Sequence, residues 1–315
     1  MDNNNSPKKK ISYSRSIAIV FLLLSSVYAM LHSTHHQQAN MGAIAQIGEG
    51  NNNINTNSSV DDVNVLNAKA IAFFYSGNFE EAIALSDRAL SIEPNNVDAL
   101  NNKAVALFNL GRSNESSAVI DKALAIQPND LNALNNKALA LLDLGKFNET
   151  LAVIDKALAI QPNDVDILNN KALALLDLGK FNETLAVSNR ALSMQPNDVD
   201  ALNNKALALF YLGRSNESSA VFNEALGAQP NNLDTLNNIA FALFTAERYN
   251  ETLTVSDRAL SIEPNNVDAL NIKGLALAGM GQYNQALKLF DRVLAIDPNN
   301  IAALDNKKSV TDAMK

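Results

Sequence analysis

The chain has 315 residues, a formal net charge of −8, 47 % hydrophobic residues, and neither cysteine nor tryptophan. This hydrophobic content suffices for a continuous core, whereas the missing cysteine excludes disulfides, thiolate metal sites and cysteine nucleophiles. All three histidines, His32, His35 and His36, lie near the N-terminus, so the 279 residues that follow offer neither imidazole nor thiol for catalysis. We therefore expect that the protein is not an enzyme.

The negative charge lies outside the N-terminal segment. The first 29 residues carry four basic side chains (Lys8, Lys9, Lys10 and Arg15) against one acidic side chain (Asp2), which gives this segment +3 and the rest of the chain −11. Such a body repels the phosphate backbone of nucleic acids, and the sequence has no basic stripe that would attract it. We expect no nucleic-acid partner.

A short apolar run follows the basic residues, from Ile17 to Leu31. At about 15 residues it is shorter than the roughly 20 that a spanning helix needs, and it suits the apolar region of a signal peptide. Val27-Tyr28-Ala29 has the small-residue spacing of a cleavage site, and retention as a signal anchor is the alternative. Because the basic residues come first, either outcome exports the rest of the chain, which touches the membrane only through residues 1–31.

Residues 32–62 are rich in Asn, Gln, Gly and Ser and contain few large apolar side chains. This composition cannot offset the entropy cost of ordering, so we expect a flexible linker. Cleavage after Ala29 would place a new amino terminus close to His32, an arrangement suited to Cu(II) or Ni(II). Solvated linker histidines are the simpler interpretation, and we predict no bound metal and no cofactor.

Proline positions show that the rest of the chain is an internal repeat. Seven prolines recur every 34 residues without an insertion, and a fixed period of this size predicts a stacked array over residues 63–300. The prolines are Pro94, Pro128, Pro162, Pro196, Pro230, Pro264 and Pro298.

One repeat, residues 97–130, predicts a hairpin of two amphipathic helices. Leu100 and Ala104 begin an apolar helix face, and Gly111 stands where a helix end needs a positive φ. The second helix ends at the proline, which cannot continue it, and Asp130 is placed to cap the first helix of the next repeat. Two helices this short are marginal alone, so the hairpins must stack on one another.

Two kinds of residue recur at fixed places in the first helices and predict how the hairpins pack. A leucine fills the space between helices, and a small residue four positions later lets the helices approach closely. The leucines are Leu66, Leu100, Leu134, Leu168, Leu202, Leu236 and Leu270, and the small residues are Ala70, Ala104, Ala138, Ala172, Ala206, Ala240 and Gly274.

The segment Leu134 to Gly145 reads Leu-x-x-Lys-Ala-x-Ala-Leu-x-x-Leu-Gly, and most second helices carry an alanine before the closing proline. This pattern resembles the tetratricopeptide repeat family over residues 63–300. The resemblance implies an all-α, right-handed superhelical solenoid of seven tandem helix-turn-helix repeats, with residues 301–315 as a C-terminal capping helix. The sequence departs from the family pattern at Glu247, which replaces the hairpin glycine of the sixth repeat, and five repeats lack the usual second-helix aromatic.

The resemblance further implies that the first helices line a concave groove. An asparagine pair follows the leucine in five first helices, and the second asparagine of each pair matches a ladder that grips peptides in some family members. Asparagine amides donate and accept hydrogen bonds, so a ladder of them can hold an extended peptide backbone of any sequence. The expected groove residues are Asn101, Asn102, Asn135, Asn136, Asn169, Asn170, Asn203, Asn204, Asn237 and Asn238, with Phe108, Phe210 and Phe244 in an apolar row beside them.

Aspartates flank this face and favour a neutral or basic peptide or protein ligand. The alternative interpretation is that the asparagines are polar helix-surface residues copied by recent duplication, since the third and fourth repeats are almost identical.

The sequence also contains recurrent N-x-S/T sequons, five at hairpin turns and one in the linker. Together with export they predict glycans along one edge of the stack, whereas the alternative is that each turn asparagine caps the second helix. Asn284 has the same place without a sequon, which favours the alternative. The candidate glycosylation sites are Asn57, Asn114, Asn148, Asn182, Asn216 and Asn250.

The leading hypothesis is therefore an extracytoplasmic, non-enzymatic scaffold that binds extended peptides. The alternative is a structural, glycosylated component of the cell envelope that has no peptide ligand.

Overall fold

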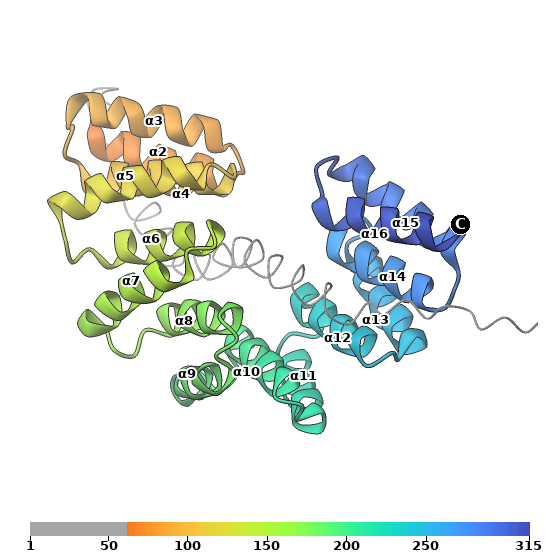
Figure 1. Cartoon of the computed structure of the whole chain (residues 1–315). Helices are drawn as coiled ribbons and strands as arrows, with labels where there is room; N and C mark the ends of the chain where they lie inside the picture. The colour runs from red at the N-terminus through yellow and green to blue at the C-terminus, as the bar shows by residue number, and fades with distance from the viewer. Residues whose placement is uncertain (1–61) are drawn as a thin grey trace, which may run out of the picture. The chain divides into compact units, whose positions relative to one another are not determined.

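The computed structural model describes residues 62–315, so the predictions for residues 1–31, the linker up to residue 61 and the sequon at Asn57 lie outside the described residues. The described part consists of α-helices of 13 or 14 residues without a strand, which confirms the predicted tandem helix hairpins (Figure 1). Residues 62–194 and residues 195–315 form two compact units.

The unit of residues 62–194 contains four hairpins. Its first helices are α2 (Val63–Tyr75), α4 (Val97–Asn109), α6 (Leu131–Asp143) and α8 (Val165–Asp177), and its second helices are α3 (Phe79–Ile92), α5 (Ser113–Ile126), α7 (Phe147–Ile160) and α9 (Phe181–Met194).

The unit of residues 195–315 contains three hairpins and a final single helix. Its first helices are α10 (Val199–Tyr211), α12 (Leu233–Thr245) and α14 (Val267–Gly279), its second helices are α11 (Ser215–Ala228), α13 (Tyr249–Ile262) and α15 (Tyr283–Ile296), and the chain ends with α16 (Ile301–Ala313).

Side-chain caps define the starts of the first helices. Asp130 accepts a hydrogen bond from the backbone N–H of Ala133 at 2.6 Å, and Asn266 does the same for Ala269 at 2.9 Å. These bonds satisfy N–H groups that have no partner within a helix, and they confirm that the residue after each proline turn caps the next repeat.

A left-handed residue ends the first helix of each hairpin and reverses the chain. Gly111 has φ of 72°, and five other turns use a glycine with φ between 67° and 78°. In the sixth hairpin Glu247 adopts φ of 57°, so the turn keeps its shape although its residue has a Cβ that disfavours it.

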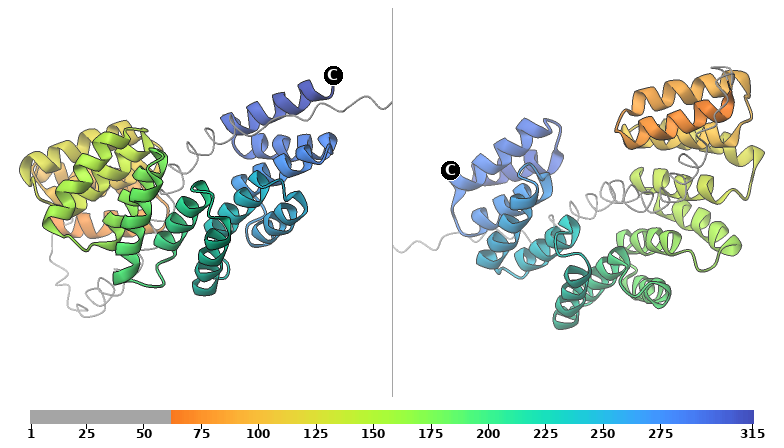
Figure 2. Two further views of the ribbon diagram at one scale, coloured as in Figure 1. Left: turned by 60° about the horizontal axis from the view of Figure 1, so that its bottom comes forward. Right: turned by 180° about the vertical axis from the view of Figure 1, so that it is seen from behind.

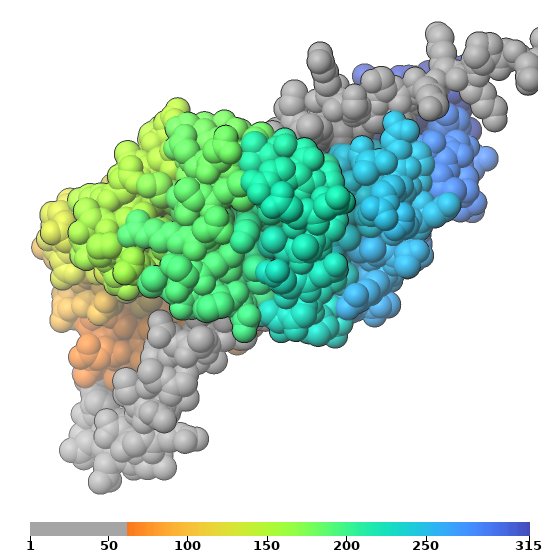
Figure 3. Space-filling view, turned by 90° about the horizontal axis from the view of Figure 1, so that it is seen from below, coloured from red at the N-terminus to blue at the C-terminus, as the bar shows by residue number. Residues whose placement is uncertain are grey.

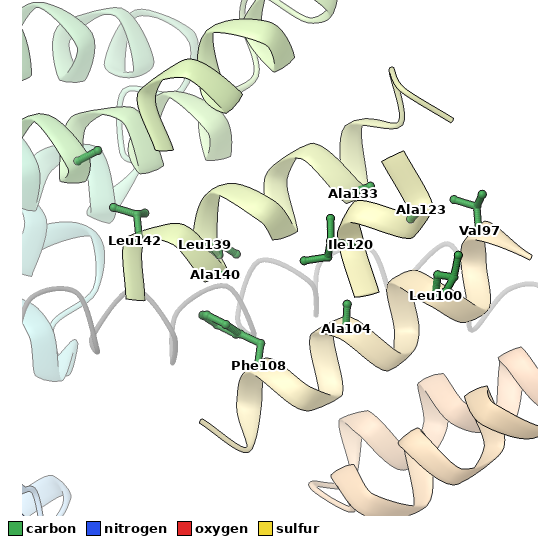
Figure 4. Packing of buried hydrophobic residues seen from close by; sticks show 11 residues of the cluster. Val97, Leu100, Ala104, Phe108, Ile120, Ala123, Ala133, Leu139, Ala140 and Leu142 are labelled. Carbon is green, nitrogen blue, oxygen red and sulfur yellow. The ribbon is translucent and has the colours of Figure 1, made fainter. Parts of the chain in front are cut away.

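Apolar side chains pack between successive helices within each unit. In residues 62–194, Leu100, Ala104 and Phe108 of α4 meet Ile120 of α5 and Leu139 of α6 in one cluster (Figure 4). Ala104 is fully buried, and its small side chain lets the helices approach closely at this point. The predicted pattern of large and small residues is therefore the observed core pattern.

The seven predicted leucines are all buried, whereas the equivalent Leu304 of α16 is 47 % exposed. The difference arises because a second helix covers this leucine in each complete hairpin, and no second helix follows α16 in the described chain. Figure 2 shows the paired helices of each unit from two further directions, and in Figure 3 the hairpins of residues 195–315 form adjacent bands.

Candidate peptide-binding face

The first asparagine of most pairs points into the stack. Asn101 donates from Nδ2 to Oδ1 of Asp130 at 3.1 Å, and Asn237 donates in the same way to Asn266 at 3.1 Å. Both acceptors are the capping residues of the next first helix. These asparagines therefore connect one hairpin to the next, a structural task that the sequence interpretation missed.

The same interaction also occurs where no asparagine pair exists. Asn67 of α2 is followed by Ala68 and donates to the cap Asn96 at 3.1 Å. An asparagine that stands 29 residues before a capping Asp or Asn is thus placed for this bond, although Asn271, which stands 29 residues before the cap Asn300, does not form it. Of the remaining first asparagines, Asn169 and Asn203 are also buried, and Asn135 is half-buried.

Most of the second asparagines, which we call the ladder asparagines, partly reach the surface. In residues 62–194 they are Asn102 on α4, Asn136 on α6 and Asn170 on α8, all half-buried, and these three helices contact each other in order. Asn170 donates from Nδ2 to Oδ1 of Asn135 at 2.7 Å, so adjacent first helices are hydrogen-bonded across this face.

The ladder is shorter in residues 195–315. Asn204 of α10 is buried, Asn238 of α12 is half-buried, and Ile272 occupies the equivalent position of α14 with its side chain fully buried. The amide surface of this unit is consequently smaller than that of residues 62–194.

The predicted apolar row is divided between core and surface. Phe108 and Phe244 are each only 5 % exposed, and both belong to core clusters, so they support the face from behind. Phe210 is half-buried and makes an edge-on contact with Tyr211, their ring centroids lying 5.5 Å apart. Of the three predicted phenylalanines, Phe210 is thus the one placed to touch a ligand directly.

Aspartates occur in the first turn of several first helices. Asp98 and Asp166 are exposed in residues 62–194, whereas Asp234 of α12 is 2 % exposed. Burial, and then the charge of Asp268, raises the pKa of Asp234 to about 9. Burial, and then the charge of Glu263, raises the pKa of Asp268 to about 6. A cationic group beside these aspartates would favour their charged forms.

The lysines of the first helices pair with other aspartates. Lys103 contacts Asp87 at 2.6 Å, and Lys171 contacts Asp155 at 2.6 Å. Each bridge joins a first helix to the second helix of the preceding hairpin, so the lysine charge is held at the joint between hairpins.

Family comparisons agree with this architecture. The sequence model of the tetratricopeptide repeat family matches residues 73–140, and that of the N-terminal TPR repeat region of Psidin matches residues 173–290. A model described as anaphase-promoting complex, cyclosome, subunit 3 matches residues 114–191. The chain is a tetratricopeptide repeat protein.

One solved structure shares the TPR fold at low sequence identity. A tetratricopeptide repeat protein from Parabacteroides merdae is 17 % identical, with a TM-score of 0.69 over 79 % of this chain and 98 % of the other. MamA from Desulfovibrio magneticus is 19 % identical, with a TM-score of 0.49 over 53 % of this chain and 95 % of its own. A comparison with curated proteins found no match.

The sequon asparagines lie just inside the second helices of the TPR hairpins. Asn114 is the second residue of α5, whose N-cap is Arg112, and Asn148 is the second residue of α7, whose N-cap is Lys146. The alternative that these asparagines cap the second helices is therefore wrong. The N-cap side chains form no capping hydrogen bond, and Arg112 instead pairs with Glu115 through two bonds of 2.7 Å.

Residues 62–315 contain neither a metal-binding cluster nor a membrane-spanning helix. Within these residues no group of three or more His, Asp and Glu side chains is arranged to hold a metal ion, and the histidines lie outside the described part. None of the helices described is sufficiently long and apolar to cross a bilayer.

Proposed function

We propose that this TPR protein is an exported, non-enzymatic scaffold that binds extended peptide segments on the first-helix face of residues 62–194. Its fold points to protein–protein interaction as the general role. Export rests on the N-terminal sequence of residues 1–31, and the absence of an enzymatic role rests on the missing thiols and the restricted histidines.

The observation that carries this proposal is the row of ladder asparagines Asn102, Asn136 and Asn170. They recur once per hairpin, on helices that contact one another, and each is partly accessible. The Nδ2 atom of Asn102 is buried and has no hydrogen-bond partner within the described structure, so a rotation of this side chain would present an unused donor to a ligand. Each amide can donate to a peptide carbonyl and accept from a peptide N–H.

The charge of the face suggests the class of ligand. Exposed Asp98 and Asp166 lie on the same first helices as Asn102 and Asn170. Carboxylates that flank a binding face disfavour acidic ligands and attract basic ones, with an effect that salt weakens. We therefore propose a neutral or basic peptide.

A structural role in the cell envelope is the second candidate. The Asn170–Asn135 bond and the buried Asn204 favour it, because they show ladder asparagines engaged within the stack itself. Under this alternative the asparagines stabilise the joints between hairpins, and the first-helix face binds no peptide.

Peptide binding to the full chain tests the proposal. The probes are fluorescent 12-residue peptides of Ala, Gly and Ser that contain no lysine, three lysines or three glutamates. We expect anisotropy titration to rank their affinities lysine, neutral, glutamate. Asn102→Ala combined with Asn136→Ala removes two amides and should weaken binding about 5- to 100-fold, because each lost hydrogen bond costs roughly 0.5–1.5 kcal/mol.

Asn182→Ala is the matched control, because Asn182 is an exposed asparagine of the second helix α9. It should leave the affinity unchanged. Equal binding by the wild type and the Asn102/Asn136 variant, with both chains folded by circular dichroism, would reject the ladder and favour the structural role.

A further inference from the structure

The five described sequons place their two important side chains in opposite environments. Each asparagine is exposed, and each hydroxyl residue two positions later is at most 2 % exposed. The asparagines are Asn114, Asn148, Asn182, Asn216 and Asn250, and the hydroxyl residues are Ser116, Thr150, Thr184, Ser218 and Thr252.

The folded hairpin uses each hydroxyl internally. Ser116 donates to the carbonyl of Ala104 in the paired first helix at 2.8 Å, and Ser218 repeats this bond to Ala206 at 2.8 Å. Thr150 donates instead to the carbonyl four residues earlier at 3.1 Å, as do the other two threonines. Each hydroxyl is therefore buried and already hydrogen-bonded.

The fold does not require a hydroxyl at this place. Ala82 in α3 and Ala286 in α15 occupy the equivalent position and are 1 % and 0 % exposed. A small side chain is thus sufficient for helix packing, and the hydroxyl is an addition found only in the five middle hairpins.

The fold gives the asparagine of each sequon no structural role. Among the described residues, none of the five asparagine side chains has a hydrogen-bond partner, and none caps its helix. Asparagine is a weaker helix former than Glu, which stands at this place in α3 as Glu80. Helix packing therefore requires neither part of the tripeptide, although both parts occur together five times.

We propose that these five sequons are acceptors for N-linked glycans and that the transferase modifies them before their hairpins fold. The inference deepens the proposed export, on which its occurrence in the cell rests. In the transfer, the asparagine amide nitrogen bonds to the anomeric carbon of a lipid-linked oligosaccharide. The bond from that carbon to the lipid phosphate breaks, the phosphate leaves with its electron pair, and the amide loses one proton to a base.

The order of events follows from the motif itself. An N-x-S/T acceptor is defined by its hydroxyl, so a transferase has to contact that group. In the folded hairpin the hydroxyl lies under the helix and donates to a backbone carbonyl, whereas in the unfolded segment it is free. Once attached, the glycan projects from an exposed asparagine and leaves the hydroxyl able to return to its carbonyl, so folding proceeds with the sugar outside.

In vitro transfer tests the order without depending on export. The unmodified full chain is presented to a membrane fraction that contains oligosaccharyltransferase and its lipid-linked donor, first folded and then as its own tryptic digest. Cleavage after Arg112 and Lys122 yields residues 113–122 with the Asn114 sequon intact. We expect this peptide to be glycosylated on the order of 100-fold faster than the folded chain, because only locally opened hairpins expose the hydroxyl.

Two variants make the outcome decisive. Ala286→Ser completes a sequon at Asn284, and its tryptic peptide should become an acceptor while the folded variant does not. Ser116→Ala removes the Asn114 acceptor and should keep the fold, as Ala82 does in α3. Equal rates for folded chain and peptide would overturn the proposed order, and failure of every peptide to accept a glycan would overturn the acceptor assignment.

Peptide mapping of the exported protein from its native source separates this inference from the proposed function. Peptide acceptors in vitro combined with unmodified sites in an exported native chain would reject glycosylation in the cell. A native chain that keeps its basic N-terminus in the cytoplasm together with residues 62–315 would reject export instead.

Discussion

The joints between hairpins differ between the two units although the repeat length is constant. In residues 62–194 a lysine–aspartate bridge spans each of the three joints between hairpins, as in the Lys137–Asp121 pair at 2.7 Å. In residues 195–315 the joint between α11 and α12 has Asn223 and Ile239 at the equivalent positions. The next joint, from α13 to α14, regains the bridge as Lys273–Asp257 at 2.5 Å.

A second polar connection is also missing at α11. Arg258 of α13 donates to the backbone carbonyl of Pro230 at 2.5 Å, and Arg292 of α15 donates to Pro264 at 2.7 Å. The equivalent residue of α11 is Glu224, whose side chain lacks the N–H donors of arginine. The apolar core is therefore repeated faithfully from hairpin to hairpin, whereas the polar connections between hairpins are not.

We expect the largest effect from removing a core leucine, and the change should be similar in the two units if both use the same core pattern. Leu134→Ala in α6 and Leu236→Ala in α12 each empty a fully buried site and should lower the free energy of unfolding by about 2–5 kcal/mol in urea titrations. Leu304→Ala is the matched control, because this leucine is 47 % exposed and should cost much less. Equal losses at Leu134 and Leu304 would contradict the packing described above.

The pH dependence of stability should differ between substitutions of first-turn aspartates in the two units. Asp234 has a folded pKa of about 9, whereas an unfolded aspartate has a pKa of about 3.9. Between these values the folded state holds a proton that the unfolded state has released, so stability should fall as pH rises, by up to about 1.4 kcal/mol per pH unit. Asp234→Asn should flatten this slope, and the exposed Asp98→Asn should not.

Two helices approach closely at Gly274, so the effect of Gly274→Ala on stability should change sign with the size of the side chain that faces it. A Cβ at Gly274 would lie 2.6 Å from Cε1 of the buried Phe290, so Gly274→Ala should cost about 1–3 kcal/mol by overpacking. In a Phe290→Ile background the same change should instead stabilise by about 1 kcal/mol, through higher helix propensity. The paired hairpin α4–α5 already combines Ala104 with Ile120. A double-mutant cycle in urea would reveal the coupling, and strictly additive effects would count against it.

Some features of this fold could be predicted from the sequence and others could not. The helices and turns could be predicted because proline, glycine and capping residues act locally, as Gly111 and Asp130 do. The Asn101–Asp130 bond was not predicted, because it joins residues 29 positions apart through the stacking of two hairpins. Phe108 was assigned to the ligand face for a related reason: helical periodicity does not tell which apolar side chains the neighbouring hairpin will cover.

We expect a smaller effect on stability from a substitution in the turn between α12 and α13. Glu247 has φ of 57°, a conformation that costs an L-residue with a Cβ on the order of 1 kcal/mol, so Glu247→Gly should stabilise by about that amount. Gly213→Ala, at the matched turn of α10 and α11 with φ of 76°, should lose a similar amount. Thermal unfolding measures both changes, and opposite signs to these would refute the strain at Glu247.

We expect the smallest effect from two substitutions that rebuild the missing ion pair between α11 and α12. Asn223→Asp with Ile239→Lys should show a coupling energy of about 0.2–1 kcal/mol at low salt, because an exposed ion pair contributes little. The coupling should largely disappear in 1 M NaCl, where charges are screened within about 3 Å.

The reverse cycle, Asp155→Asn with Lys171→Ile, should remove the same quantity from the joint between α7 and α8. If it does so while the rebuilt bridge gives no coupling, then the joint at α11 holds its helices too far apart for the pair to form. In that case the difference between the two joints would lie in their backbone packing rather than in two polar side chains.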